Sequence, residues 1–320
     1  MATEPLTSSA RFEFHPMRSL LLHLSGSKRL APVMMRNSVS RRVARRFVAG
    51  ETLDDVCSAA REVNRARQLA SLDLLGENVG DEAGARRAAE GYLTIFDRID
   101  QEKLEANVSL KLTQLGLDLG QSLCEELLQR IVSHAARKNN FVRVDMEGSV
   151  YTQRTIEIVK SVRARYPAVG TVMQSYLYRT EQDVRDLLEV GCRIRLCKGA
   201  YNEPPKIAFP KKSDVDANYV KLMKILLPSG IYHGIATHDP AMIDATKDFA
   251  REKKIGPDRF EFQMLYGIRT DLQKQLVREG YRLRIYIPYG SDWFPYFMRR
   301  LAERPANLIF FLRSLIPRSS

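Results

Sequence analysis

An alternation of short β-branched segments with amphipathic helical stretches, repeated eight times from residue 68 onward, constrains the fold more than any other feature of this sequence. Each apolar segment ends in a few polar residues, and a stretch with helical periodicity follows it. Segment starts recur every 22 to 40 residues, which is typical of βα units rather than of a short-period solenoid. The segments expected to be strands are residues 68–77, 105–112, 141–148, 168–178, 192–201, 232–239, 259–267 and 281–290.

Eight βα units in about 250 residues fit an α/β fold of the (β/α)8 barrel type. A doubly wound sheet is the alternative, but it more often uses fewer strands, and no G-x-G-x-x-G follows any of these segments. Upstream, TLDDVCSAAREVNRARQLA (residues 52–70) is the clearest helical stretch. We therefore predict one catalytic barrel over residues 68–320, with an N-terminal helical arm over residues 1–67 packed against it.

Composition excludes several classes of protein. The chain has 44% hydrophobic and 28% charged residues, as an ordinary globular protein does. Its four cysteines form no C-x-x-C pair, and its five histidines form no H-x-x-x-H pattern, so neither a disulfide scaffold nor a metal site is expected. No apolar run approaches the length that a membrane span requires.

Positive charge is concentrated at the N-terminus. Residues 1–50 hold nine Lys/Arg and two acidic residues, a net charge of +7 out of +12 for the whole chain. Aromatic residues are sparse in this basic arm, and no nucleic-acid-binding signature is present, so we expect no nucleic-acid partner. Weak contact with an anionic membrane surface remains compatible with the arm.

Barrel enzymes carry their chemistry at the carboxyl ends of the strands. One buried Lys or Asp in a strand is often only a satisfied ion pair, but here polar groups recur at the end of strand after strand, which favours a site. The residues at or near these ends are Lys111, Asp145, Met146, Glu147, Gln174, Arg195, Lys198, Gly199, Ala200, Tyr201, Thr237, His238, Asp239, Gln263, Leu265 and Tyr286.

This rim is rich in hydrogen-bond donors, which suits a phosphate or an electron-rich ring. Paired carboxylates placed for glycoside hydrolysis are not evident, nor is a G-x-S-x-G nucleophile. The residues alone leave two reaction classes open: chemistry carried by a bound cofactor, or Schiff-base chemistry on Lys111 or Lys198. A basic binding module on a barrel scaffold is a third interpretation, but it leaves the rim residues unexplained.

The segment SDWFPYFMRRLAE near the C-terminus predicts an amphipathic helix. Tyr296, Arg299, Arg300 and Glu303 share one face of it, because residues three and four apart are neighbours, and an apolar stripe forms the other face. Taken alone, the pattern indicates a surface helix that shows its polar face to water.

The motifs VSLKL, FVRVDMEG, TVMQSYLYR, RLCKGAY, ATHD, FEFQMLYG, RIYIPYG and YFMRRLAE follow one another between about residues 70 and 310. K-G-A-Y or T-H-D alone would be a weak signal, but this ordered set resembles proline dehydrogenase, the flavoenzyme of proline breakdown. The length, without a second catalytic domain, resembles the monofunctional form rather than the form fused to an aldehyde dehydrogenase.

The resemblance implies a distorted (β/α)8 barrel with non-covalent FAD at its mouth and with the last helix over that mouth. The arginine pair would then clamp the carboxylate of L-proline instead of facing water. The residues that match the family's substrate-binding positions are Lys111, Leu265, Tyr286, Tyr296, Arg299 and Arg300. Those that match catalytic positions are Asp145 and Arg195, and those that match cofactor-binding positions are Met146, Gln174, Arg195, Lys198, Gly199, Ala200, Tyr201, Thr237 and His238.

The expected reaction is oxidation of L-proline to 1-pyrroline-5-carboxylate, with a hydride leaving proline C5 for flavin N5. The bulky Tyr286 favours proline over 4-hydroxyproline. Electrons would pass to a membrane quinone, and the basic arm would contact the membrane surface. The implied location is cytoplasmic or peripheral at the inner membrane, in the mitochondrion if the source is eukaryotic. The Pro-rich residues 202–214 are expected to form a loop at the active-site face, suited to act as a lid.

Overall fold

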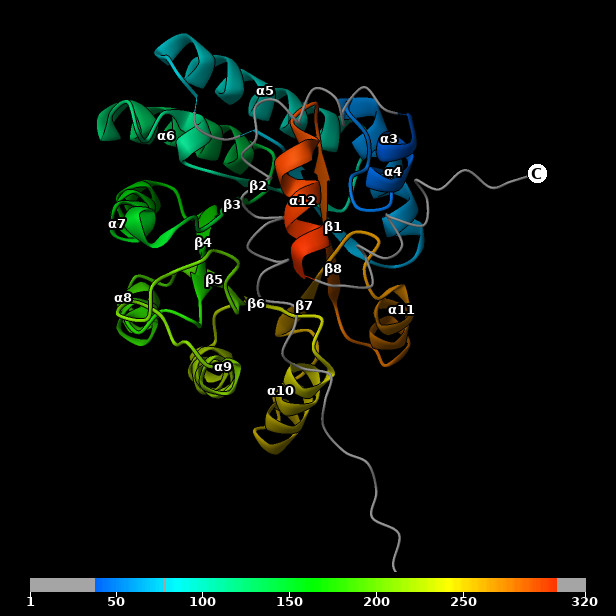
Figure 1. Cartoon of the computed structure of the whole chain (residues 1–320), viewed down its shortest axis with the longest axis vertical. Coiled ribbons are helices and arrows are strands. Elements are labelled where there is room, and N and C mark those ends of the chain that lie inside the picture. Colours follow the sequence, from blue (N-terminus) through cyan, green and yellow to red (C-terminus); the bar gives the residue numbers. More distant parts are fainter. Residues whose placement is uncertain (1–37, 77–78, 304–320) are drawn as a thin grey trace, which may run out of the picture.

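The computed structural model describes residues 38–76 and 79–303. Within these residues, eight parallel strands pair in chain order and close into a barrel (Figure 1). The strands are β1 (Leu69–Leu74), β2 (Ala106–Leu110), β3 (Val142–Val144), β4 (Val169–Gln174), β5 (Arg193–Cys197), β6 (His233–Ala236), β7 (Phe260–Leu265) and β8 (Leu283–Tyr289). Each lies inside the segment predicted for it, so the (β/α)8 barrel is confirmed and the open doubly wound sheet is excluded.

Helices cover the outside of the barrel between consecutive strands (Figure 1). Two short 3-10 turns accompany them, η1 (Thr113–Leu115) and η2 (Leu227–Ser229). The helices are α3 (Ser38–Ala44), α4 (Leu53–Arg65), α5 (Glu82–Gln101), α6 (Gln121–Arg137), α7 (Ser149–Arg165), α8 (Thr180–Glu189), α9 (Lys212–Leu226), α10 (Pro240–Glu252), α11 (Thr270–Arg278) and α12 (Trp293–Glu303).

Local sequence accounts for several helix starts. Thr52 and Asp55 form a reciprocal capping box at the start of α4, with each side chain accepting the other residue's backbone N–H. Asp239 caps α10 by accepting the Ala241 amide, and Pro240 occupies the first turn, where a missing N–H costs nothing.

Two predicted boundaries were wrong. The helix predicted over residues 52–70 ends at Arg65, because Arg67 adopts a left-handed φ of 60° and the chain then enters β1. The loop predicted over residues 202–214 is shorter, since α9 already begins at Lys212. Residues 1–37 of the predicted arm lie outside the described residues, so the arm and its positive charge are described only from Ser38 onward.

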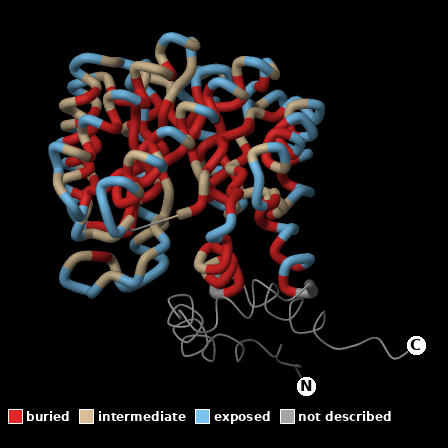
Figure 2. Tube along the Cα trace, turned by 90° about the horizontal axis from the view of Figure 1, so that it is seen from above, coloured by how far each residue is buried: buried red, intermediate tan, exposed pale blue. Residues whose placement is uncertain are grey.

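The inside of the barrel is polar, unlike the aliphatic layers usual in this architecture. Side chains alternate along a strand, so every second residue points inward. Arg195 on β5 contacts Ser109 on β2, Gln263 on β7 and Asp145 directly after β3, which only a side chain inside the barrel can reach. Outward residues of the strands are apolar and pack beneath the helices, and they include Leu72, Val108, Leu110, Val142, Val144, Ile194, Leu196, Phe262 and Ile285. Buried residues accordingly run through the whole body of the molecule, and exposed ones lie on its outside (Figure 2).

A second apolar cluster lies at the carboxyl ends of the strands. It joins α3 and α12 to the ends of β1, β7 and β8, and α12 crosses the barrel mouth (Figure 1). Its members are Val43, Ala44, Phe47, Val48, Leu75, Ile268, Trp293, Phe294, Tyr296, Phe297, Met298 and Leu301, with Leu265 and Tyr286 packed against them. The last helix therefore lies over the mouth, as expected. The division into an arm (1–67) and a barrel (68–320) stays a prediction.

We expect His233 to make the fold sensitive to mild acid. The ring is fully buried, accepts the Ile194 amide at Nδ1 (3.0 Å) and contacts the Ser229 hydroxyl at Nε2 (3.0 Å). Burial, with Arg143 nearby, lowers the pKa of His233 from 6.5 to about 3. As pH falls below about 6.5, His233 therefore binds a proton in the unfolded chain but not in the folded chain. The free energy of unfolding falls progressively towards pH 3 as a result.

Urea denaturation at pH 7 and pH 4.5 measures this effect. The His233→Gln variant should lose less stability between these two pH values than the wild type loses. Ser229→Ala is the matched control, because it removes a contact of the ring and keeps the imidazole, so its loss should match the wild type. Equal losses in wild type and His233→Gln would contradict the assignment.

Candidate active site

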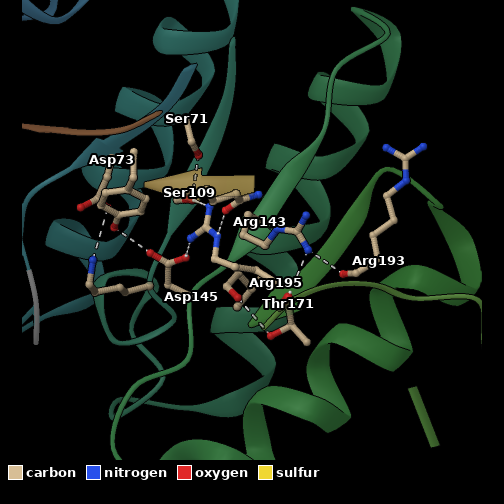
Figure 3. A network of polar contacts seen from close by, with 12 residues as sticks. Ser71, Asp73, Ser109, Arg143, Asp145, Thr171, Arg193 and Arg195 are labelled. Atoms are coloured by element: carbon tan, nitrogen blue, oxygen red, sulfur yellow. Dashed lines mark hydrogen bonds and ion pairs between the residues drawn. The ribbon is translucent and has the colours of Figure 1, made fainter. Parts of the chain in front are cut away.

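Arg195 is the centre of a buried polar network inside the barrel. Its side chain is only 7% exposed. Nη1 donates to Asp145 Oδ1 (2.8 Å), Nη2 donates to Ser109 Oγ (3.0 Å), and Nε donates to Gln263 Oε1. Figure 3 shows the guanidinium between Asp145, which follows β3, and Ser109, which is on β2. With a partner at each nitrogen, the guanidinium is fixed in position and orientation.

Asp145 links this arginine to Tyr286. The second carboxylate oxygen of Asp145 accepts the Tyr286 hydroxyl at 2.7 Å, and the Arg195 guanidinium lies 5.2 Å from the centre of the Tyr286 ring. Burial and the Asp145 carboxylate raise the pKa of Tyr286 well above its ordinary value, so the hydroxyl stays protonated and acts as a donor. The ring is thereby held at the mouth, packed against the cluster that contains α12.

Gln263 is itself oriented from the layer below. Its Nε2 donates to Glu261 Oε1 at 2.5 Å, which turns its carbonyl oxygen towards Arg195. Arg284 binds the same Glu261 carboxylate through Nε (2.7 Å) and Nη2 (3.0 Å). Burial opposes ionisation of Glu261, but the Arg284 guanidinium holds its pKa below the ordinary value, so the carboxylate remains charged.

Lys111 follows β2 and is buried, and its Nζ lies 3.2 Å from Oδ1 of Asp73 on β1. Asp73 has no exposed surface. Figure 3 shows Asp73 in the same part of the barrel interior as Asp145, whose carboxylate also accepts the Tyr286 hydroxyl.

Sequence reasoning identified Lys111, Asp145, Arg195, Gln263 and Tyr286, and the structure brings them into one region. It missed the residues that hold them, namely Asp73, Ser109, Glu261 and Arg284. The available signal was period-two alternation: a polar residue at every second position of an otherwise apolar strand indicates an inward-facing polar ladder.

The residues predicted to contact a cofactor lie along the ends of β3 to β6. Met146 is buried after β3, and Gln174 ends β4. Gln174 Nε2 donates to the Glu147 carbonyl (2.9 Å), while its Oε1 is buried without a hydrogen-bond partner within the described part of the chain. A buried acceptor of this kind can accept a hydrogen bond from a bound group or from an ordered water.

After β5, the chain passes tightly over Tyr176. Gly199 adopts φ of 119°, and a Cβ at this position would lie 2.3 Å from the Tyr176 ring, so only glycine fits. Lys198, just before it, lies between Asp216 Oδ1 (2.5 Å) and Asp239 Oδ2 (2.7 Å). Ala200 is exposed and Tyr201 half-buried on the same stretch.

Thr237 and His238 follow β6. Thr237 Oγ1 accepts the Asp239 amide (3.1 Å), which shapes the turn into α10. His238 Nε2 accepts the backbone amide of Leu265 at the end of β7 (2.9 Å). His238 therefore connects the row of predicted cofactor residues with a predicted substrate residue.

The Pro-rich segment at 202–211 is anchored over the strand ends. Glu203 accepts the backbone amide of Ser149 (2.7 Å) and its hydroxyl (2.6 Å), and so caps α7, whose own N-cap residue, Gly148, has no side chain. Farther along, Ala208 forms a bridge with Leu177. These ties hold the segment across the ends of β3 and β4.

The polar face of α12 is not turned to water. Tyr296 and Arg300 are buried, with 5% and 8% exposure, and Arg299 is half-buried. The Arg300 guanidinium lies 4.9 Å from the centre of the Tyr296 ring. The interpretation of a surface helix with a solvated polar face is therefore wrong, since Tyr296 and Arg300 on this face are buried.

Comparison with known proteins gives consistent matches. The family model described as proline dehydrogenase matches residues 56–313. The chain is 44% identical over 298 residues to proline dehydrogenase 2 of Bacillus subtilis strain 168, covering 93% of this chain and 98% of that protein. It is 40% identical over 279 residues to proline dehydrogenase of Deinococcus radiodurans, covering 86% and 90% of the two chains.

Among solved structures, the barrel resembles proline utilization A (PutA) from Bdellovibrio bacteriovorus inactivated by N-propargylglycine. The TM-score is 0.78 at 26% identity, with 82% of this chain and 33% of that chain covered. This chain thus spans about a third of the length of that protein.

Proposed function

This chain belongs to the proline dehydrogenase family and is an oxidoreductase that acts on proline, and we propose that it oxidises L-proline to 1-pyrroline-5-carboxylate by hydride transfer from C5 to N5 of a non-covalent FAD. This activity is the first step of proline catabolism. The observation that carries the proposal is the buried network of Arg195, Asp145 and Tyr286, in which Tyr286 packs against the apolar cluster that contains α12 at the barrel mouth.

On the substrate side, the proposal is that Lys111, Arg299 and Arg300 bind the carboxylate of proline. A guanidinium matches a carboxylate bidentately, and such charge-assisted bonds are stronger where water is scarce. The ring of proline would pack on Leu265, Tyr286 and Tyr296, which meet in the apolar cluster at the mouth. Positioning C5 is then the main contribution of the protein.

On the cofactor side, the described residues fit a flavin. Gln174 offers a buried acceptor that no described residue uses, and Arg195 offers a fixed positive charge in the same barrel. FAD, when bound, would supply the two-electron acceptor that this oxidation needs. The remaining residues of the proposed cofactor site are Met146, Lys198, Gly199, Ala200, Tyr201, Thr237 and His238.

We propose different roles for the two partners of Asp145 in this network, Arg195 and Tyr286. The Arg195 guanidinium, held by Asp145, would stabilise negative charge that develops on the acceptor side. Tyr286, held protonated by its bond to the same carboxylate, would shape the ring pocket and favour proline over 4-hydroxyproline.

Two further elements of the proposal concern the electron acceptor and location. A membrane quinone would receive the electrons, and the protein would act in the cytoplasm or peripherally at a membrane. Support comes from α3 and the residues after it, where Arg41, Arg42 and Arg45 are exposed next to the cluster at the mouth. Of the helices in residues 38–76 and 79–303, none combines the length and apolarity needed to cross a bilayer.

Liposome sedimentation tests the membrane contact. Replacing Arg41, Arg42 and Arg45 together by glutamine should reduce binding to vesicles that contain phosphatidylglycerol. Unchanged binding would refute the proposed membrane contact.

An anaerobic absorbance spectrum tests the proposed reaction. The purified protein, supplemented with FAD, should show a flavin band that bleaches on addition of L-proline and much less on addition of 4-hydroxyproline. A band that ignores proline would refute the substrate assignment, and protein that never binds FAD would refute the cofactor.

Schiff-base chemistry has less support. Lys198 is paired with two carboxylates and Lys111 with one, and an ion-paired ammonium is a poor nucleophile. Trapping with borohydride in the presence of a carbonyl substrate would reveal such an activity.

A further inference from the structure

We propose that Asp73 is a positioning residue for substrate binding: its buried carboxylate holds the Lys111 ammonium beneath the barrel mouth, where that ammonium receives the carboxylate of proline. This inference rests on the proposed function, because it assigns a role within the same site. Asp73 belongs to none of the residue sets that the sequence motifs predict.

Strand geometry places the pair at the top of the barrel interior. Ser71 on β1 and Ser109 on β2 point inward, since their hydroxyls meet at 3.0 Å and Ser109 also binds Arg195. Asp73 on β1 and Lys111 directly after β2 come two residues later along the chain, so they lie one layer nearer the carboxyl ends, and their side chains meet there. That layer also holds the bond between Tyr286 and Asp145.

Because both side chains are buried, the Lys111 ammonium depends on the negative charge of Asp73. Asp73 has no exposed surface and Lys111 is 7% exposed, so water does little to stabilise either charge. A buried ammonium remains protonated and in place only with a counter-charge, and Asp73 Oδ1 lies 3.2 Å from Nζ.

Asp73 is also costly to keep in this position. Its Oδ2 is buried and makes no hydrogen bond to any described residue. Burial raises the pKa of Asp73, the Lys111 ammonium opposes this, and the nearby Asp145 carboxylate raises the pKa further. An ion pair with so little hydrogen bonding is a poor source of stability, because apolar residues often serve as well in its place. Its value lies instead in where it holds the ammonium.

An ammonium has three donors, and the bond to Asp73 Oδ1 uses one of them. Because Asp73 lies below and the mouth above, the pair would direct the remaining donors towards the bound carboxylate. Loss of the Asp73 charge should therefore weaken binding of ligands that carry a carboxylate, and only those.

Asp73→Asn tests this, because it keeps the shape and removes the charge. With the flavin-loaded protein, we expect the KM for L-proline to rise about tenfold while kcat changes less than about twofold. The Kd for cyclopentanecarboxylate, measured by calorimetry, should rise by a similar factor; this ligand has the ring and carboxylate without the amine. Binding of pyrrolidine, which has the ring and amine without the carboxylate, should stay the same.

A double-mutant cycle distinguishes action through Lys111 from a general effect. In a Lys111→Met background, Asp73→Asn should change the Kd of cyclopentanecarboxylate less than about twofold. Ser71→Ala is the matched control, because it removes a buried polar contact from the same strand. The Kd of cyclopentanecarboxylate for this variant should match that for the wild type. If Asp73→Asn fails to fold, Asp73→Ser, which leaves room for a water molecule, replaces it in each of these experiments.

Two results would overturn the inference. One is an unchanged Kd for cyclopentanecarboxylate in the Asp73 variant, and the other is equal weakening of this ligand and pyrrolidine. Either result, with a wild type that oxidises proline, leaves the proposed function standing. A wild type that neither oxidises proline nor binds cyclopentanecarboxylate would refute both.

Discussion

Replacing Arg300 by methionine is expected to raise the KM for L-proline about a hundredfold while the bound flavin content stays the same. Loss of one partner from a desolvated charge pair costs about 2–5 kcal/mol, and each 1.4 kcal/mol is about a factor of ten. Methionine retains an unbranched apolar stem that can still pack on the Tyr296 ring, so the loss should come from the charge rather than from the fold. Steady-state kinetics with proline and the flavin absorbance of the purified variant measure both quantities.

The control for this variant is Arg278→Ala. Arg278 is exposed near the end of α11, and its removal should leave the KM unchanged. Arg299→Met should shift the KM in the same direction as Arg300→Met. Release of flavin by either α12 variant would contradict the proposal that this helix serves the substrate rather than the cofactor.

Replacing Arg195 by methionine is expected to lower the free energy of unfolding by about 3–5 kcal/mol and to abolish turnover. The large stability cost arises because Asp145, with a 12% exposed side chain, loses its ion-pair partner inside the barrel. Gln263 and Ser109 lose a donor at the same time. Urea denaturation and the anaerobic proline assay measure the two effects.

The double variant Arg195→Met with Asp145→Asn separates stability from chemistry. Neutralising the Asp145 carboxylate, which has lost its ion-pair partner, should restore part of the lost stability, because burying a neutral group costs less free energy than burying an unpaired charge. Turnover should not return. An Arg195→Met variant as stable as the wild type, or one that keeps a tenth of its activity, would show that the guanidinium is not the centre of the network.

The sequence predicted the barrel well because the signal for each βα unit is local: an apolar run, polar residues at its end and a helical stretch. Lys111, Asp145 and Arg195 could be identified because they stand at strand ends or within motifs. Their partners could not, because which residue meets Arg195 depends on distances across the barrel. Glu261 and Ser109 are 66 positions after and 86 positions before Arg195 in the chain, and only closure of the sheet brings them near it.

The face of α12 shows a different limit. Periodicity correctly separates Tyr296, Arg299 and Arg300 from the apolar stripe, but it cannot say what lies opposite each face. A helix on the outside of the barrel and one across its mouth have the same pattern. Only the packing of Phe294 and Phe297 against α3 and the strand ends decides between them. Periodicity also could not predict that α4 ends at Arg65. The helix ends there because Arg67 adopts a left-handed φ.

The position of α12 has a consequence for redesign. Two of the three groups proposed to hold the carboxylate, Arg299 and Arg300, sit on a single 11-residue helix together with Tyr296 of the ring pocket, whereas the groups proposed for the cofactor are built into β3 to β6 and the turns after them. The helix is the last described element and contributes no strand to the sheet, so it can be varied without changing any strand pairing. Libraries confined to this helix offer a route to oxidases of other cyclic amines on an unchanged electron-accepting scaffold.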